Sequence, residues 1–459
     1  MSKKTLLSVV AVIAVIAVFV VLNSSSGYVA VAALDYHYGN TEETQEIEEE
    51  TEEAEDFIIY EESAPAIFEG FRATDEDFRG VWVTTVINLD FPTTPALSNE
   101  EIRREINYIV DTSAAMGLNA IILQVRPAGD AIYPSNIFPW SKYLTGEQGL
   151  APADGFDPLA YWLYRTHGAG MELHAWINPY RVTHTTSNIR DVNLLYPTSP
   201  ARLNPHLVVP FARGSNYALY LDPGFPESRQ IIIDGIIELL TNYDLDGIHF
   251  DDYFYPGRYF NDSVSFAMHG YGMSHREWRL NNVNTLIYEV RQTINYINPN
   301  VRFGISPTGI WANDNIEPRG SATRGYQHYI ELAADSLHWI REGWVDYIIP
   351  QIYWHIGFEI ADYYTLLRWW ENALYGSDVA LHIGHAAWRE YEGHMGWRPP
   401  GELLRQLQLN YQSDIVRGSV FFRWWHLRDH VADTLYNWYA ERPLPENEWL
   451  TSPLRYTAN

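Results

Sequence analysis

The sequence predicts an α/β protein whose main part folds as a (β/α)8 barrel. From Phe78 onward, eight short runs of apolar, β-branched and aromatic residues alternate with eight stretches that are patterned as helices. Such alternation is typical of repeated βα units around a parallel sheet. The chain has 459 residues, of which 46% are hydrophobic and 19% are charged, as in ordinary folded proteins. These observations exclude a disordered, collagen-like or multi-span membrane protein.

The eight predicted strands are rich in residues that favour an extended backbone. In chain order they are FRGVWVTTV from Phe78, AIILQVRP from Ala120, MELHAWINPY from Met171, DGIHFDDYFYP from Asp246, VRFGISPTGIW from Val301, DYIIPQIYW from Asp346, VALHIGHAAW from Val379 and GSVFFRWWHL from Gly418. A helical pattern follows each of them, so each strand can be connected to the next by a helical crossover.

The first predicted helix has the clearest boundaries. Ser98 is its N-cap, Glu101 completes a capping box, and Gly117 ends it. The other predicted helices begin at Asp157, Pro226, Arg276, Tyr326, Ala361, Gly401 and His430.

Two closures of this series are possible, an open doubly wound sheet or a closed barrel. Eight units in about 370 residues favour the barrel. No Gly-rich phosphate loop follows the first strand, so nothing favours a dinucleotide-binding open sheet. The segment 181–225, rich in Pro and Asn, is too long for a plain barrel loop, and we expect it to fold over the C-terminal end of the barrel.

Residues 1–33 are predicted to be a signal peptide or an N-terminal anchor. Two lysines precede an uncharged apolar run of 17 residues that begins at Leu6, long for a signal peptide and short for a spanning helix of about 20 residues. Ala30 and Ala32 offer a cleavage site, which favours release. We therefore expect an extracellular or cell-surface protein that meets a membrane only through this segment.

Residues 34–70 are predicted to be a disordered acidic linker. Segment 41–62 holds twelve carboxylates and no basic residue, so like charges repel and no core can form. The barrel is then assigned to residues 71–442, and residues 443–459 are a C-terminal tail.

Composition excludes several classes of partner and chemistry. Acidic residues outnumber basic ones by 58 to 31, a formal charge of −27, so nucleic acid is not an expected partner. The absence of cysteine excludes disulfides, thiol catalysis and thiolate-held metal sites. Strand one lacks the H-x-H pair of barrel metallohydrolases. No metal and no cofactor are therefore expected.

Candidate functional residues follow from the predicted fold, because barrel active sites lie at the C-terminal ends of the strands. The polar and aromatic candidates at those ends are Arg126, Asp130, His174, Asn178, Arg181, Asp251, Asp252, Tyr253, Trp311, Gln351, Tyr353 and Trp354.

Strand four is the most informative. Its side chains alternate, so His249, Asp251 and Tyr253 share a face that we expect to point into the barrel. Asp251 is the leading candidate for the catalytic carboxylate. Asp252 is on the opposite face by this phase, but alternation relaxes at a strand end and Asp252 can turn inward.

Hydrolysis of a glycosidic bond needs a second carboxyl group across the sugar. Asp252, Asp130, Asp314 and Glu390 are the candidates, and the sequence does not choose among them. The chain also has 17 Trp and 32 Tyr, several at strand ends, including Trp388 and Trp425. Rings with polar edges suit the faces of sugars.

Seven motifs of the chain together resemble the glycosyl hydrolase-like 10 family. They are FRGVWVTTV, LQVRPAGDAIYPS, HAWINPYR, LDPGFPESR, DGIHFDDYFYP, GISPTGIW and DYIIPQIYW. Members are exported bacterial proteins that include hydrolases of peptidoglycan glycan strands. The resemblance implies a barrel glycosidase and a sugar-polymer substrate. It marks Arg126, Asp130, His174, Asn178, Arg181, Asp251, Asp252, Gln351 and Tyr353 as matching motif positions.

The leading hypothesis is an exported glycoside hydrolase of cell-wall glycan strands or a related polysaccharide. Asp251 would be the catalytic carboxylate, with Asp252 or Asp130 as its partner. Strand six offers Gln351 where some barrel glycosidases carry their acid. This departure keeps open an alternative, a non-catalytic barrel that only binds carbohydrate. A weaker third hypothesis is a surface scaffold whose barrel end docks another protein.

Overall fold

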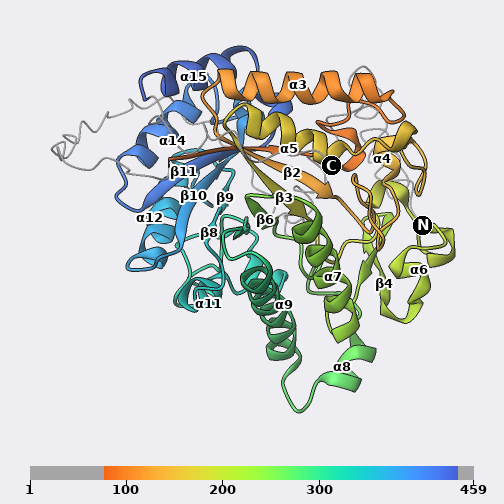
Figure 1. Cartoon of the computed structure of the whole chain (residues 1–459). Coiled ribbons are helices and arrows are strands. Elements are labelled where there is room, and N and C mark those ends of the chain that lie inside the picture. Colours follow the sequence, from red (N-terminus) through yellow and green to blue (C-terminus); the bar gives the residue numbers. More distant parts are fainter. Residues whose placement is uncertain (1–76, 443–459) are drawn as a thin grey trace, which may run out of the picture. The chain divides into compact units, whose positions relative to one another are not determined.

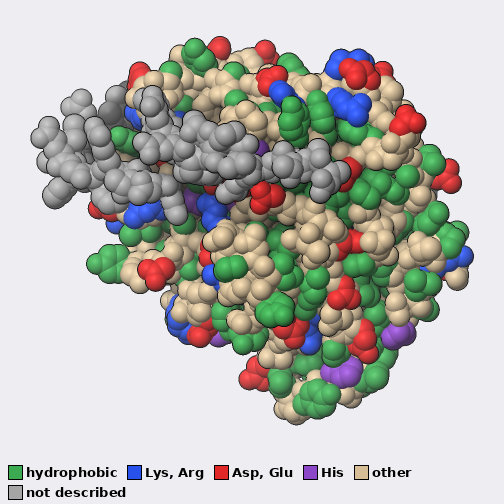
Figure 2. Space-filling view, in the orientation of Figure 1, with side chains coloured by type: hydrophobic (Ala, Val, Ile, Leu, Met, Phe, Trp, Pro, Cys, Tyr) green, Lys and Arg blue, Asp and Glu red, His purple; other side chains and the backbone are tan. Residues whose placement is uncertain are grey.

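A computed structural model describes residues 77–442 of the chain (Figure 1). The segments 1–33, 34–70 and 443–459, on which the signal, linker and tail predictions fall, lie outside the described residues. Within residues 77–442, no helix combines the length and apolar character needed to cross a bilayer. On the face that Figure 2 displays, acidic and basic side chains are interspersed among apolar and uncharged ones.

The predicted barrel is confirmed, because all eight strand runs form parallel strands that close into a ring. β8 and β9 are the two halves of the sixth strand, interrupted around Pro350. The hydrogen-bonded order is β11, β1, β2, β3, β6, β7, β8 with β9, and β10, which pairs again with β11. The strands are β1 (Phe78–Val83), β2 (Ala120–Arg126), β3 (Glu172–Ile177), β6 (Gly247–Phe250), β7 (Arg302–Ile305), β8 (Tyr347–Ile348), β9 (Gln351–Ile352), β10 (Ala380–His385) and β11 (Val416–Phe421).

Helices connect the strands and surround them in Figure 1. They are α3 (Asn99–Ala115), α5 (Pro158–Gly168), α7 (Pro226–Asn242), α9 (His275–Ile297), α11 (Ser336–Arg341), α12 (Tyr363–Leu374), α14 (Glu402–Tyr411) and α15 (Asp429–Ala440). The capping box of Ser98 and Glu101 starts α3 as predicted. Shorter helices lie in loops that follow strand C-termini: α4 (Lys142–Thr145), α6 (Pro200–Leu203), α8 (Ser263–His269), α10 (His328–Glu331) and α13 (Ala387–Glu392).

The helix predicted from Tyr326 is wrong as a single element. It is divided into α10 and α11, and Ala333 between them has a φ of 53°, which no α-helix continues through. The buried His328 bonds Thr308 at 3.1 Å and Ser336 at 2.9 Å, so tertiary contacts hold the break.

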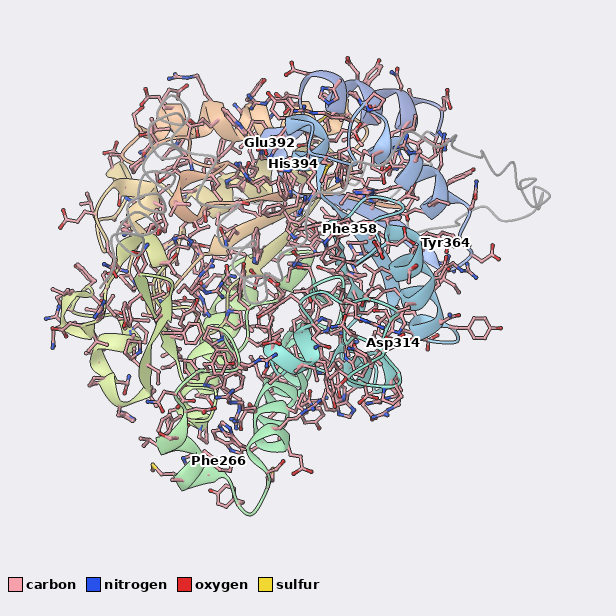
Figure 3. All side chains as sticks on the ribbon, turned by 180° about the vertical axis from the view of Figure 1, so that it is seen from behind. Phe266, Asp314, Phe358, Tyr364, Glu392 and His394 are labelled. Atoms are coloured by element: carbon pink, nitrogen blue, oxygen red, sulfur yellow. The ribbon has the colours of Figure 1, made fainter. Side chains whose placement is uncertain are left out.

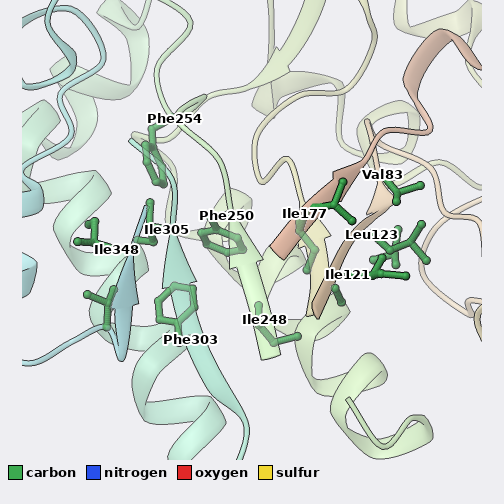
Figure 4. Close-up of a cluster of buried hydrophobic side chains, with 14 of the residues drawn as sticks. Val83, Ile121, Leu123, Ile177, Ile248, Phe250, Phe254, Phe303, Ile305 and Ile348 are labelled. Carbon is green, nitrogen blue, oxygen red and sulfur yellow. The ribbon is translucent and has the colours of Figure 1, made fainter. Parts of the chain in front are cut away.

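The core has two layers, as the alternation of side chains along the strands requires. Outward-facing residues such as Ile121, Phe250 and Phe303 pack between the strands and the helices (Figure 4). The inward-facing residues form a second, smaller cluster, namely Phe78, Trp82, Ala120, Ile122, Trp176, Tyr347, Ile349 and Val420. The barrel interior is therefore filled with side chains, and a ligand can be bound only at its ends.

Two strand glycines make room for this filling. A Cβ on Gly247 would overlap the ring of His174, and a Cβ on Gly304 would overlap the ring of Tyr347. Large rings from neighbouring strands thus occupy the space that side chains on β6 and β7 leave free.

The long segment after β3 contains an antiparallel hairpin, β4 (Val208–Arg213) and β5 (Asn216–Leu221). This hairpin was not among the elements predicted from the sequence. Its tip reaches the loop that follows β6, where Phe211 packs on Phe260 with ring centroids 6.2 Å apart and Arg213 donates to the carbonyl of Pro256 at 3.3 Å. The segment therefore covers part of the C-terminal end of the barrel.

Candidate active site

Asp251 and Asp252 directly follow β6 at the C-terminal end of the barrel. Asp251 is 4% exposed, and its carboxylate accepts hydrogen bonds from the Asn178 side chain and, at 3.1 Å, from the backbone N–H of Tyr253. Asn178 in turn accepts from the Gln124 amide at 2.7 Å and from Arg181 Nη2 at 2.9 Å. Side chains at the ends of β2 and β3 therefore hold Asp251 in one orientation.

Asp252 is 5% exposed and interacts with the strand-six side of the barrel end. Gln351 forms a hydrogen bond with its carboxyl group and also donates from Nε2 to the carbonyl of Ser306 at 2.7 Å. The positive charge of Arg213, from the hairpin tip, also acts on Asp252. These contacts place Asp252 beside Asp251 at the barrel end, the inward turn that the relaxed alternation allowed.

The two carboxyl groups differ in pKa. Burial raises the pKa of Asp251, while the charge of Arg181 and the hydrogen bonds of Tyr253 and Asn178 oppose the rise. Burial and the negative charge of Asp251 both raise the pKa of Asp252. Asp252 is consequently the member of the pair that keeps its proton to higher pH.

Arg181 links Asp251 to Asp130. Its Nε donates to the carbonyl of Pro127 at 2.8 Å, and its charge lowers the pKa of both carboxyl groups. Asp130 is buried in its own loop with Ser141 and Gln148, and burial raises its pKa to about 6. Asp130 therefore lies in a separate loop, where the charge of Arg181 acts on it, whereas Asp252 adjoins Asp251 directly.

Aromatic side chains surround the pair. The guanidinium carbon atoms of Arg181 and Arg213 lie 5.5 and 5.7 Å from the ring centroid of the half-buried Tyr253. Burial and the negative charges of Asp252 and Asp251 raise the pKa of Tyr353. Trp354, the next residue in the chain, is half-buried and packs against the outer core.

Three other residues predicted to bind sugar, His174, Arg126 and Trp311, are not brought to the pair by the structure. His174 lies deep in the barrel, level with Gly247 at the start of β6, bonding Tyr347 Oη at 2.8 Å and Glu172 at 3.1 Å. Asn178, which bonds Asp251, is four residues further along the chain than His174. At the rise per residue of a strand, this separates the two residues by about 13 Å. Burial lowers the pKa of His174 to about 4, as for a neutral core histidine.

Arg126 points out of the barrel towards α7. The pairing of β2 with β3 shifts register between Gln124 and Arg126, so Arg126 aligns with the outward-facing Ile177. Its guanidinium lies 4.4 Å from the ring centroid of Phe138, and burial lowers its pKa to about 10.

Trp311 is fully buried between Tyr329 and Trp369, with ring centroids 4.5 and 5.9 Å away, in the layer beneath the helices.

The other carboxyl candidates have structural roles. Asp314 pairs with Arg324 at 2.5 Å on the surface, and Glu390 caps the backbone of α14.

Sequence reasoning missed Arg213 and Phe422 as residues of this site. Arg213 comes from the hairpin, for which the sequence holds two signals, the unusual length of the segment 181–225 and the two-residue turn Gly214-Ser215 between two strand-like runs. Phe422 follows β11 and stacks on Tyr353, with ring centroids 5.9 Å apart.

Within the described residues, no three His, Asp or Glu side chains gather closely enough to hold a metal ion.

The model of the glycosyl hydrolase-like 10 family matches residues 77–391, which include the strand-four pair. The chain belongs to this family. As a glycosyl hydrolase-like 10 protein, it is a glycosidase, and its substrate is a carbohydrate.

Curated relatives agree with this assignment. The glycosyl hydrolase YngK of Bacillus subtilis is 41% identical over 390 residues, which cover 82% of this chain and 75% of that protein. The glycosyl hydrolase DigH of Escherichia coli is 37% identical over 369 residues, covering 76% and 83%.

Solved structures share the fold of this glycosyl hydrolase-like 10 protein. The glycoside hydrolase domain of PgaB from Bordetella bronchiseptica aligns with a TM-score of 0.51 at 16% identity, covering 78% of this chain and 98% of that domain. The catalytic domain of a β-amylase from Paenibacillus polymyxa aligns with a TM-score of 0.50 at 12% identity, covering 81% and 99%.

Proposed function

We propose that this glycosidase cleaves glycosidic bonds in peptidoglycan glycan strands or a related cell-wall polysaccharide, outside the cytoplasm. Asp252 donates the proton and Asp251 is its ionised partner. The observation that carries the proposal is the buried pair after β6. Arg181, Tyr253 and Asn178 favour the ionised form of Asp251, whereas burial and the adjacent negative charge of Asp251 favour the protonated form of Asp252.

The division of roles follows from these environments. A glycosidase needs one protonated carboxyl group for the leaving oxygen and one ionised carboxylate for the positive charge that develops on the sugar. Asp252 keeps its proton because its ionisation would place two negative charges side by side in a buried site. Asn178 and Arg181 stabilise the charge of Asp251, so this carboxylate can face the developing oxocarbenium ion.

The strand-six amide also has a place in this mechanism. Gln351 forms a hydrogen bond with Asp252, so the acid comes from strand four and strand six orients it. The absence of a strand-six carboxyl group therefore does not favour the non-catalytic alternative.

The N-terminal sequence supports the location and the substrate class. An apolar run after two lysines, followed by an acidic spacer, suits a protein that is exported and then held away from a membrane or released. Peptidoglycan and other cell-wall polysaccharides are the sugar polymers that such a protein meets.

The test uses purified glycan strands from which peptide stems have been removed. Wild-type protein should release reducing ends and shorter oligosaccharides that mass spectrometry identifies. Asp251→Asn should fold normally and release none, while Asp314→Asn, which changes a surface carboxylate after another strand, should match the wild type. Undiminished release by Asp251→Asn would refute its role. Binding of strands without any product would support the non-catalytic alternative.

A second experiment addresses the location. The full chain, expressed in a bacterium, should be found outside the cytoplasm after fractionation, and deletion of residues 1–33 should retain it inside. Equal cytoplasmic retention of both forms would contradict export.

A further inference from the structure

We propose that Phe422, Trp388, Glu392 and His394 form a sugar subsite, the Glu392 subsite, that binds a more distant sugar of the same glycan chain. Its ligand is a sugar that presents a hydroxyl or amide N–H donor to Glu392. The inference rests on the proposed function, since it takes the substrate to be a glycan chain.

The Glu392 subsite adjoins the catalytic pair through aromatic contacts. Tyr353, next to Asp251 and Asp252, stacks on Phe422 at 5.9 Å. Tyr353 also belongs to a small buried cluster with Ala386 and Trp397, against which the half-buried Phe422 and Trp388 pack. A row of rings therefore leads from the acid pair to the loop after strand seven.

The helical phase of α13 turns Glu392 towards the same side. Ala387 and Tyr391 pack against the outer core, whereas Trp388 packs against the Tyr353 cluster at the barrel end. Glu392 is four residues after Trp388, so the two share one face of the helix. Gly393, with a φ of 64°, then ends α13 and brings His394 back against Trp388, with ring centroids 4.8 Å apart.

Two imidazoles hold the Glu392 carboxylate in a fixed orientation. His394 Nε2 lies 2.8 Å from Oε2, and His426 Nε2 lies 3.6 Å from Oε1. Figure 3 labels Glu392 and His394 next to each other. Burial raises the pKa of Glu392, but the hydrogen bonds and charges of His426 and His394 bring it below its ordinary value.

These features match what a sugar requires. Glu392 has a side chain that is 24% exposed, so an ionised acceptor with a fixed orientation remains accessible. The rings of Phe422 and Trp388 supply an apolar wall for the C–H face of a sugar. Arg389 lies over one face of Trp388, with its guanidinium 4.5 Å from the ring centroid, and Tyr353 stacks on one face of Phe422, so the sugar contacts the other face of these rings.

The test compares Glu392→Ala with wild type on peptide-free glycan strands of defined length. Loss of a hydrogen bond to a charged acceptor should lower kcat/KM about 10- to 100-fold for strands long enough to reach the Glu392 subsite. The shortest strands that are cleaved should react at the wild-type rate. The control is Glu342→Ala, because Glu342 also lies beside a histidine, His338 at 3.8 Å, but just after α11, near the N-terminal end of β8.

A binding experiment distinguishes an error in the Glu392 subsite from an error in the proposed function. In the Asp251→Asn background, calorimetry with a long strand should show a 10- to 100-fold weaker affinity after Glu392→Ala. That loss would support the subsite even if the wild type cleaved nothing. Equal affinities, equal kcat/KM at every length, or no binding of any strand would overturn it. If Glu392→Ala does not fold, Glu392→Gln is used, since the amide can still bond both imidazoles.

Discussion

Replacing Asp252 by Asn tests the assignment of the acid most directly. Asparagine keeps the size of the side chain and can still bond Gln351, but it has no proton to transfer. A positioned general acid contributes about 10²- to 10⁴-fold to a rate, which corresponds to about 2.7 to 5.5 kcal/mol of transition-state stabilisation. We therefore expect kcat on glycan strands to fall by that factor.

The assay compares two leaving groups. A sugar hydroxyl is a poor leaving group and needs the proton, whereas an activated aryl glycoside of the same sugar leaves with little protonation. Asp252→Asn should lose the full factor on the glycan and only a small part of it on the aryl glycoside. Asp251→Asn should lose activity on both. Equal losses by Asp252→Asn on both substrates would refute its role as the acid.

The same substitution has a pH signature in stability. The pKa of Asp252 is higher in the folded protein than in the unfolded chain, so its contribution is fully present below the unfolded pKa and is lost as pH rises through the folded pKa. Asp252→Asn lacks this loss. Its melting temperature should therefore rise relative to that of the wild type as the pH increases from about 4 to about 8, and a constant difference over this range would contradict the raised pKa.

Three further predictions concern other parts of the molecule. Arg213→Met removes a charge that lowers the pKa of Asp252, so the alkaline fall of kcat/KM should move to higher pH; an unchanged profile would contradict the placement of the hairpin. Asp90→Ala leaves the buried Arg423 without its carboxylate partner at 2.7 Å and with only the carbonyl of Leu89, so chemical denaturation should show a loss of about 3 to 5 kcal/mol, and an unchanged free energy of unfolding would be the contrary result. Tyr347→Phe removes the hydroxyl that bonds Nδ1 of both His174 and His249, so stability should fall by about 1 to 3 kcal/mol while kcat stays constant; a large loss of kcat would return His174 to the active site.

The sequence located the strand-four pair because the information is local. A run of β-branched and aromatic residues defines β6, and the fold places everything directly after it at the C-terminal end. Asn178 and Gln351 were found in the same way, since each lies at a strand end. The order of the strands in the barrel then predicts which of these side chains lie close together in space.

Residues whose position depends on the exact strand phase or depth were predicted wrongly or missed. A single register shift in β2 turned Arg126 outward, and no feature of the local sequence marks such a bulge. His174 shares a face with Asn178, but it lies about 13 Å lower along the strand. Arg213 comes from a hairpin whose two-residue turn, Gly214-Ser215, is a local signal, but contacts with the loop after β6 bring its tip to the site.

The amino-acid sequence by itself determined the barrel, its order of strands and helices, and the end at which chemistry can occur. These features follow from hydrophobic periodicity and from the direction of parallel strands, which short segments encode. Only the tertiary structure decided which carboxyl group keeps its proton. That depends on burial, on the charges of Arg181 and Arg213 and on the hydrogen bond of Gln351, which come from three distant segments. Electrostatic energies are set by distance in space and by the loss of water around each group.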